Sequence, residues 1–335
     1  MNRPRLAALL LLALGLALGV VAAGASSPHG PIRIRSEADL HPGNGVVSGS
    51  GNAGDPYIIS GWAIEVRAGI GIEVRGISCH LVVGDCELTG SPRGTTGILL
   101  EAAPHARIAG CTFLGLDTGV FLYRGDKASV EESVFTGCRR AIEGSESDAI
   151  RVAGNRVEDG TEDGVFLWRC DDVRLVDNVI SQCADGLYLD SCHRGALFGN
   201  HVAGGDHGIF LWDCFDCTVT GNTVRGCELG LAVVHTSEGN RLSANTVFDT
   251  ARPATCDRAG NAWDDGYPAG GNFWAGEAFE DRFSGADQDE PGADGIADAP
   301  RAIPFESIDR YPLMAAPDGV EEGPEPIHGN REDAQ

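Results

Sequence analysis

The chain has 335 residues, of which 49 are acidic and 25 are basic, so its formal net charge at pH 7 is -24. A charge of this sign repels the phosphate backbone of nucleic acids and anionic lipid surfaces, and it suits cations or neutral sugars better. The 47 glycines indicate many turns, and the aliphatic residues do not gather into amphipathic helices.

Residues 1–25 carry the features of an export signal. Positive charge near the N-terminus precedes an apolar stretch from Leu6 to Ala23, and small residues follow it as a signal peptidase requires. The apolar stretch is about the minimum for a bilayer span, so a retained N-terminal anchor is the alternative. We expect a secreted, periplasmic or cell-surface protein, a monomer with no membrane span after signal cleavage.

A repeat occupies the centre of the chain. A phrase of the form Gly-aliphatic-x-Leu recurs at intervals of 22 or 23 residues. Its copies begin at Gly97, Gly119, Gly164, Gly186, Gly208 and Gly230, and Ala141 fills the missing place. Short strands at this period, with no helix between them, bury their apolar sides only by stacking on their neighbours.

The repeat therefore predicts an all-β fold, a single-stranded right-handed parallel β-helix. A leucine-rich repeat would show a Leu-x-x-Leu-x-Leu phrase, and a propeller would need blades of about 40 residues. Around the coils of residues 76–252 we expect an N-terminal β cap over residues 26–75 and an acidic, aromatic C-terminal cap over residues 253–314. The segment 315–335, rich in acidic residues, proline and glycine, is expected to be disordered.

Equal offsets in consecutive coils become neighbours in a column, about 4.8 Å apart. One such column holds asparagine, and its members are Asn155, Asn178, Asn200, Asn222 and, after one inserted residue, Asn245. Stacked asparagines can satisfy one another and the buried backbone of a turn. We expect this column to be structural.

Cysteine forms a second column, at Cys170, Cys192 and Cys214. The spacing of adjacent coils lies within the Cα separation that a disulfide accepts, so one neighbouring pair could form a bridge. The total of 11 cysteines leaves at least one unpaired, which is not typical of a disulfide scaffold.

Outward positions of the repeated strand carry aromatic residues, which we call the aromatic strip. They are Phe121, Tyr123, Phe166, Trp168, Tyr188, Phe210 and Trp212. Rings along a sheet face can stack on sugar rings, because they offer flat apolar area at a low cost in side-chain entropy. The alternative is that the rings only stiffen the sheet or lie under a loop.

A polar column borders the strip. Asp163, Asp185 and His207 each precede an anchor glycine. Neighbouring carboxylates and an imidazole can bind a cation or exchange protons, since like charges raise the pKa of one carboxyl. These are the catalytic candidates if the protein is an enzyme, although Asp is also a residue that tight turns demand.

An acidic loop occupies the predicted C-terminal cap. Asp287, Asp289, Asp294 and Asp298 surround Gly295 with a spacing reminiscent of calcium loops. The sequence predicts either a calcium site or an acidic loop without metal.

Phrases at both ends of the chain carry a resemblance to a known family. They are Gly45–Gly51, Asp55–Ile59 and Gly61–Trp62 near the start, and Asn261–Asp264, Gly270–Trp274 and Asp309–Met314 near the end. These segments resemble archaeal β-helix proteins with CASH-type repeats, classed with the NosD-like periplasmic copper-binding family. The insertion Glu290–Ala293 departs from the family's usual ending, which affects the calcium loop.

The resemblance implies help in delivering copper to nitrous oxide reductase, while the wider repeat class includes carbohydrate-binding proteins and sugar hydrolases. Copper(I) favours clustered thiolates and thioethers, and the column of Cys170, Cys192 and Cys214 is the candidate for it. We predict an exported β-helix that binds carbohydrate or another envelope component along the strip, without catalysis. The alternatives are a copper-handling accessory protein and a polysaccharide lyase or glycoside hydrolase.

Overall fold

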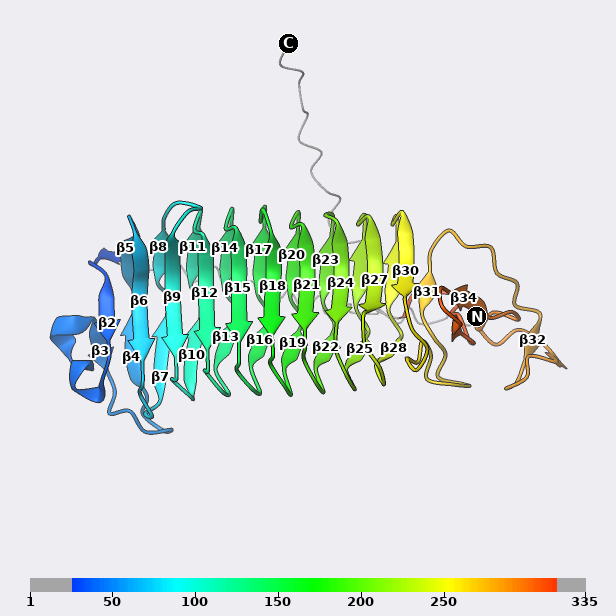
Figure 1. Ribbon diagram of the computed structural model, residues 1–335, viewed down its shortest axis with the longest axis horizontal. Helices are drawn as coiled ribbons and strands as arrows, with labels where there is room; N and C mark the ends of the chain where they lie inside the picture. The colour runs from blue at the N-terminus through cyan, green and yellow to red at the C-terminus, as the bar shows by residue number, and fades with distance from the viewer. Residues whose placement is uncertain (1–25, 318–335) are drawn as a thin grey trace, which may run out of the picture.

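The computed structural model describes residues 26–317, and nearly all of its regular structure is β-strand. The predicted export signal and the predicted tail from residue 318 onward lie outside the described residues. Three long sheets run the length of the molecule, and the chain visits them in turn, so that the coils stack as a right-handed parallel β-helix (Figure 1). The predicted fold class is therefore confirmed.

Sheet 1 has 10 strands and carries the repeated glycine phrase. It consists of β2 (Ile32–Ile34), β6 (Gly69–Arg75), β9 (Thr95–Glu101), β12 (Thr118–Tyr123), β15 (Arg140–Ser145), β18 (Asp163–Trp168), β21 (Asp185–Asp190), β24 (His207–Trp212), β27 (Leu229–Val234) and β30 (Arg252–Cys256).

Sheet 2 also has 10 strands and follows sheet 1 along each coil. It consists of β3 (Val46–Ser48), β4 (Tyr57–Ser60), β7 (Leu81–Gly84), β10 (Ala106–Ala109), β13 (Ser129–Glu131), β16 (Arg151–Ala153), β19 (Arg174–Val176), β22 (Ala196–Phe198), β25 (Thr218–Thr220) and β28 (Arg241–Ser243).

Sheet 3 has 11 strands and closes the coil. It consists of β1 (Ser27–Pro28), β5 (Trp62–Glu65), β8 (Glu87–Thr89), β11 (Thr112–Leu114), β14 (Val134–Thr136), β17 (Arg156–Glu158), β20 (Val179–Ser181), β23 (His201–Ala203), β26 (Thr223–Arg225), β29 (Thr246–Phe248) and β31 (Phe273–Trp274).

The register of the sheets follows the repeat. In sheet 1, Val120 lies beside Ile98 on one side and Ile142 on the other, and the same inward column continues to Leu231. These side chains are fully buried in one continuous apolar core. Burial of one such side chain contributes about 1.5–3 kcal/mol, so each coil is stabilised by its neighbours and not alone.

The anchor glycines are explained by a close approach inside the coil. A Cβ added at Gly186 would lie 2.3 Å from Cγ1 of Val202 and 2.7 Å from the carbonyl oxygen of Gly208. Sheet 1 and sheet 3 therefore come too close at this point for any side chain, and glycine is required there.

The predicted asparagines stack in one buried column at the turn between sheets 2 and 3. Nδ2 of Asn155 donates to Oδ1 of Asn178 at 3.0 Å, and each of the next links is 2.9 Å long. The column continues beyond Asn245 to Asn272, which the repeat did not predict. Each amide also donates to a backbone carbonyl one coil away, so the buried turn backbone is satisfied along the whole stack.

Different structures occupy the two ends of the helix. At the N-terminal end, β3 pairs antiparallel with β4, and two short 3-10 helices, η1 (Glu37–Asp39) and η2 (Pro42–Asn44), precede it. At the C-terminal end lie the antiparallel hairpins β32 (Phe283–Ser284) with β33 (Glu290–Pro291), and β34 (Arg301–Ile303) with β35 (Ser307–Asp309).

One buried carboxylate ties the C-terminal hairpins to the last coil. Oδ2 of Asp309 accepts hydrogen bonds from the backbone N–H of Asn272 and from Nε1 of Trp274, both at 2.9 Å. Burial raises the pKa of Asp309 to about 6.

No helix within residues 26–317 is long and apolar enough to cross a membrane.

Candidate functional site

The aromatic strip lies on the outer face of sheet 1, on β12, β18, β21 and β24. Its seven side chains are all partly buried. Tyr188 lies between Phe166 and Phe210 on the neighbouring strands, with ring centroids 5.1 and 5.0 Å apart in edge-to-face contacts. Phe121 and Tyr123 are separated from this group by β15, which places Glu143 and Ser145 at the corresponding positions.

A second column of the strip holds a carboxylate between two indoles. Asp190 pairs in register with Trp168 on one neighbouring strand and with Trp212 on the other. The indole of Trp212 stacks on the imidazole of His235 at 4.7 Å, and the guanidinium of Arg169 lies 4.5 Å from the ring centre of Trp168. The sequence prediction missed Asp190, although it occupies the same offset in its coil as the two tryptophans.

The predicted polar column is assembled along the border of the strip. Asp163 pairs in register with Asp185, and Asp185 with His207, so the three side chains stand on consecutive coils. Nδ1 of His207 lies 2.5 Å from Oδ1 of Asp185. Arg140, which the sequence prediction omitted, adds an ion pair from its Nε to Oδ2 of Asp163 at 2.8 Å.

Burial shifts the titration of one carboxyl of the polar column. Burial raises the pKa of Asp163 to about 6, with Arg140 opposing the shift and the neighbouring Asp185 adding to it. A carboxyl of this kind exchanges a proton near neutral pH, which is a property of general acids. Asp163 is only 5% exposed.

The strip also lies in a negative field. Burial, followed by the charges of Asp190, Asp185 and Asp163, raises the pKa of Tyr188 to about 12. The aromatic and acidic columns therefore form one surface, on which a ligand would meet rings and carboxylates together.

The cysteine column consists of free thiols. All 11 cysteines of the chain are free, and 10 of them are buried. Cys170, Cys192 and Cys214 direct their thiols at backbone carbonyls, at distances of 3.3 to 3.4 Å. The column contains no disulfide, and each of its three sulfurs lies within hydrogen-bond distance of a backbone carbonyl.

Two thiols of the column have raised pKa values. Burial raises the pKa of Cys170 to about 12, and hydrogen bonding to Cys192 and Cys217 raises that of Cys214 as well.

In the predicted calcium loop, two of the carboxylates accept hydrogen bonds from backbone N–H groups of the same region. Asp298 accepts the N–H groups of Arg282 and Phe283, and Asp294 accepts that of Ile296. Across residues 26–317, no three His, Cys, Asp or Glu side chains are grouped so that they could hold a metal ion. Asp287 and Asp289 thus do not join Asp294 and Asp298 in such a group.

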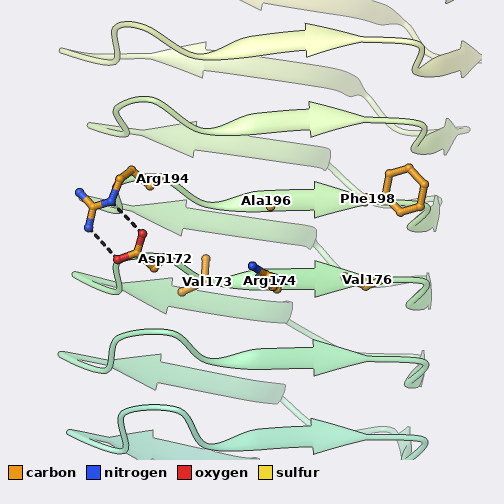
Figure 2. Close-up of a pocket in the computed structure, with 7 residues that line it drawn as sticks. All are labelled: Asp172, Val173, Arg174, Val176, Arg194, Ala196 and Phe198. Carbon is orange, nitrogen blue, oxygen red and sulfur yellow. Dashed lines mark hydrogen bonds and ion pairs between the residues drawn. The ribbon is translucent and has the colours of Figure 1, made fainter.

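A shallow hollow lies elsewhere, on sheet 2 between β19 and β22 (Figure 2). Arg194 forms two bonds to Asp172 at one end of it, Nε to Oδ1 at 2.7 Å and Nη2 to Oδ2 at 2.8 Å. Phe198, which is 53% exposed, stands alone at the other end. With one ring and one neutralised ion pair, this surface lacks the repeated rings of the strip.

The family model described as "Periplasmic copper-binding protein (NosD)" matches residues 66–278. The search of curated proteins gave no match.

Among solved structures, the chain is similar to the GH136 lacto-N-biosidase from Eubacterium ramulus, with 12% identity and a TM-score of 0.35 over 70% of this chain and 54% of that one. The fluoroquinolone resistance protein QnrB1 shows 11% identity and a TM-score of 0.23 over 58% of this chain and 91% of that one. The chain thus spans about half the length of the lacto-N-biosidase.

Proposed function

The chain belongs to the NosD family of periplasmic proteins, and from this premise we propose that it is an exported β-helix that binds carbohydrate along its aromatic strip, without catalysis. The alternative for such a strip is a purely structural role in coil stacking. The two roles make different demands on the coils that lack aromatic residues.

One observation supports binding over stacking. The position of Phe166, Tyr188 and Phe210 is filled by Glu143 on β15 and by Ala232 on β27, and both strands keep the register of the sheet. Coil stacking therefore does not require a ring at this position. The rings are concentrated on part of one face, as expected for residues that serve a ligand.

The spacing of the rings suits an extended polymer. Consecutive coils are separated by about 4.8 Å, which is close to the length of one sugar residue in an extended glycan. A glycan that lies along the helix axis would therefore meet one strand per sugar ring. Carboxylates beside the rings, such as Asp190, can accept hydrogen bonds from sugar hydroxyls.

The family description also names copper, and the described residues give no support for it. The cysteine column is buried, and residues 26–317 hold no group of three metal-binding side chains. No part of the proposed function involves copper.

Glycan cleavage is the second candidate, and the polar column is the observation that favours it. Asp163 has a pKa of about 6, and Asp185 stands on the next coil. Retaining glycosidases place their two carboxyl groups about 5–5.5 Å apart, a separation comparable with one coil step. If the protein cleaves the glycan that it binds, new reducing ends will accumulate with the wild type and not with Asp185→Asn.

The binding proposal is tested by isothermal titration calorimetry against a panel of cell-wall and plant oligosaccharides. Trp212→Ala is the test variant, since Val234 occupies the same position on β27 and shows that the fold accepts a small side chain there. Phe198→Ala, an exposed ring on sheet 2, is the matched control. We expect Trp212→Ala to weaken binding about tenfold, which corresponds to about 1.4 kcal/mol, and Phe198→Ala to leave it unchanged.

Two results would refute the proposal. One is the absence of binding to every member of the panel by folded wild-type protein. The other is equal affinity of Trp212→Ala and wild type for a bound oligosaccharide.

A further inference from the structure

We infer that the strip is selective for glycans that carry a free ammonium group, and that Asp190 is the residue that recognises it. The inference rests on the proposed carbohydrate binding and names the class of sugar, an amino sugar whose nitrogen is not acetylated. It follows from the surroundings of Asp190 and from the charge of the surface around it.

Asp190 is a carboxylate without a cationic partner. Asp163 is paired with Arg140, and Asp185 with His207, in the neighbouring polar column. The ion pairs within residues 26–317 do not include Asp190, whose Oδ1 accepts a hydrogen bond only from the hydroxyl of the adjacent Ser191, at 2.7 Å. Its side chain is partly exposed, so the negative charge is available to a ligand.

The two indoles beside Asp190 favour a cation at the same place. Trp168 and Trp212 flank it in register on the neighbouring strands. His235 covers the side of Trp212 that faces β27, so the opposite side of that ring is directed toward Asp190. Arg169 already covers one face of Trp168, so an ammonium group above Asp190 would gain the carboxylate and the free face of Trp212.

The negative charge of the surface around Asp190 also favours a cationic ligand. The pKa of Tyr188 is raised to about 12, first by its burial and then by the charges of Asp190, Asp185 and Asp163, so these three carboxylates add to the cost of a further negative charge here. The whole chain carries a net charge of -24. Polymers of uronic acids would be repelled, whereas a polymer with ammonium groups would be attracted over the distance of a Debye length, about 10 Å.

The column also fits the repeat of such a polymer. Trp168 and Trp212 are two coils apart, so their separation along the axis is about 10 Å, which is close to two sugar residues. An amino sugar over Asp190 would therefore have its neighbours in the chain beside the two indoles. One unpaired carboxylate thus gives one cation-selective position in a strip that otherwise stacks on neutral sugar faces.

The experiment compares three β-1,4-linked hexasaccharides by isothermal titration calorimetry at mildly acidic pH, where the free amine is charged. They are made of glucosamine, N-acetylglucosamine and glucose. The test variant is Asp190→Asn, which keeps the size of the side chain and the acceptor for Ser191. The control is Asp177→Asn, an exposed aspartate at the turn between β19 and β20 that carries the same change in charge.

We expect the wild type to prefer the glucosamine hexasaccharide about tenfold over the other two, as a charge-assisted contact implies. Asp190→Asn should remove this preference and leave the affinity for the two uncharged hexasaccharides unchanged. Asp177→Asn should behave as the wild type. The preference should also weaken as salt is added, since the contact is exposed.

The inference fails by itself if the uncharged hexasaccharides bind through Trp212 while the glucosamine form shows no preference, or if Asp190→Asn retains the preference. If no saccharide binds, the proposed carbohydrate function fails and the inference fails with it. Thermal unfolding of each variant checks that any loss of affinity is not a loss of fold.

Discussion

Replacement of Asn200 by alanine tests the physical basis of the fold, because this residue is central in the asparagine column. Its Oδ1 accepts from the backbone N–H of Asn178 at 3.1 Å, and its Nδ2 donates to the carbonyl of Leu175 at 2.8 Å and to Oδ1 of Asn222 at 2.9 Å. Alanine leaves the N–H of Asn178 without its acceptor and the carbonyl of Leu175 without this donor, both buried. Each such group costs about 1–3 kcal/mol, so the expected loss is about 2–6 kcal/mol.

The assay is urea unfolding followed by circular dichroism, with native-state hydrogen exchange at the amide of Asn178 as the local readout. The control is His201→Ala, the next residue along the chain, whose side chain is exposed. An exposed substitution of this kind changes stability by about 0.5 kcal/mol or less. The reasoning is wrong if Asn200→Ala costs no more than His201→Ala, or if the amide of Asn178 exchanges as slowly in the variant as in the wild type.

Three further predictions concern the backbone, the C-terminal cap and the thiols. Gly205→Ala should lower the free energy of unfolding by about 3 kcal/mol or more, because its Cβ would lie 1.8 Å from the carbonyl oxygen of Cys183. Gly226 also has a positive φ but no atom closer than 3.9 Å to an added Cβ, so Gly226→Ala should cost only about 1–2 kcal/mol. Equal losses of the two variants in urea unfolding would contradict this. Burial raises the pKa of Asp309 from 3.8 to about 6, so the folded state favours the protonated carboxyl. The stability that this proton contributes is fully present below pH 3.8 and is lost as the pH rises through about 6. Asp309→Asn should flatten the dependence of the melting temperature on pH in this window, and an unchanged slope would show that the group does not titrate there. In native protein a thiol reagent should modify only the partly exposed Cys79, and all 11 cysteines should react in urea; rapid reaction of the buried thiols without denaturant would disprove their burial.

The fold was predictable because the sequence repeats at a nearly constant interval of 22 or 23 residues. Once Gly186 and Gly208 are recognised as equivalent, the 22-residue interval and the rule of parallel stacking place Leu187 beside Ile209, as the register shows. The same logic predicted the stack of Asn178 and Asn200 without any knowledge of distances. A solenoid allows this because contacts between coils repeat at a constant interval in sequence.

Structural features that do not follow the 22-residue period could not be predicted from the sequence. Asn272 joins the asparagine column after an interval of 27 residues, since the cap inserts extra chain before it. The direction of each thiol in the cysteine column depends on side-chain rotamers, which decide between a carbonyl and a neighbouring sulfur as the partner. The same holds for Asp294 and Asp298, whose carboxylates are used by the backbone of their own loop.

Asp190 differs from these features, because it follows the period but is not aromatic like the other outward residues of its column. In the sequence it is one acidic residue among 49, although its offset from Gly186 equals that of Trp168 from Gly164, and the register confirms its place between Trp168 and Trp212. The interior columns of the β-helix are nearly uniform because every coil must meet the same packing requirement. An outward column has no such requirement, so a break in its composition carries information about ligands that a break in an inward column does not. A carboxylate between two indoles is such a break, and it is a feature of the outer face that the packing of the coils does not require.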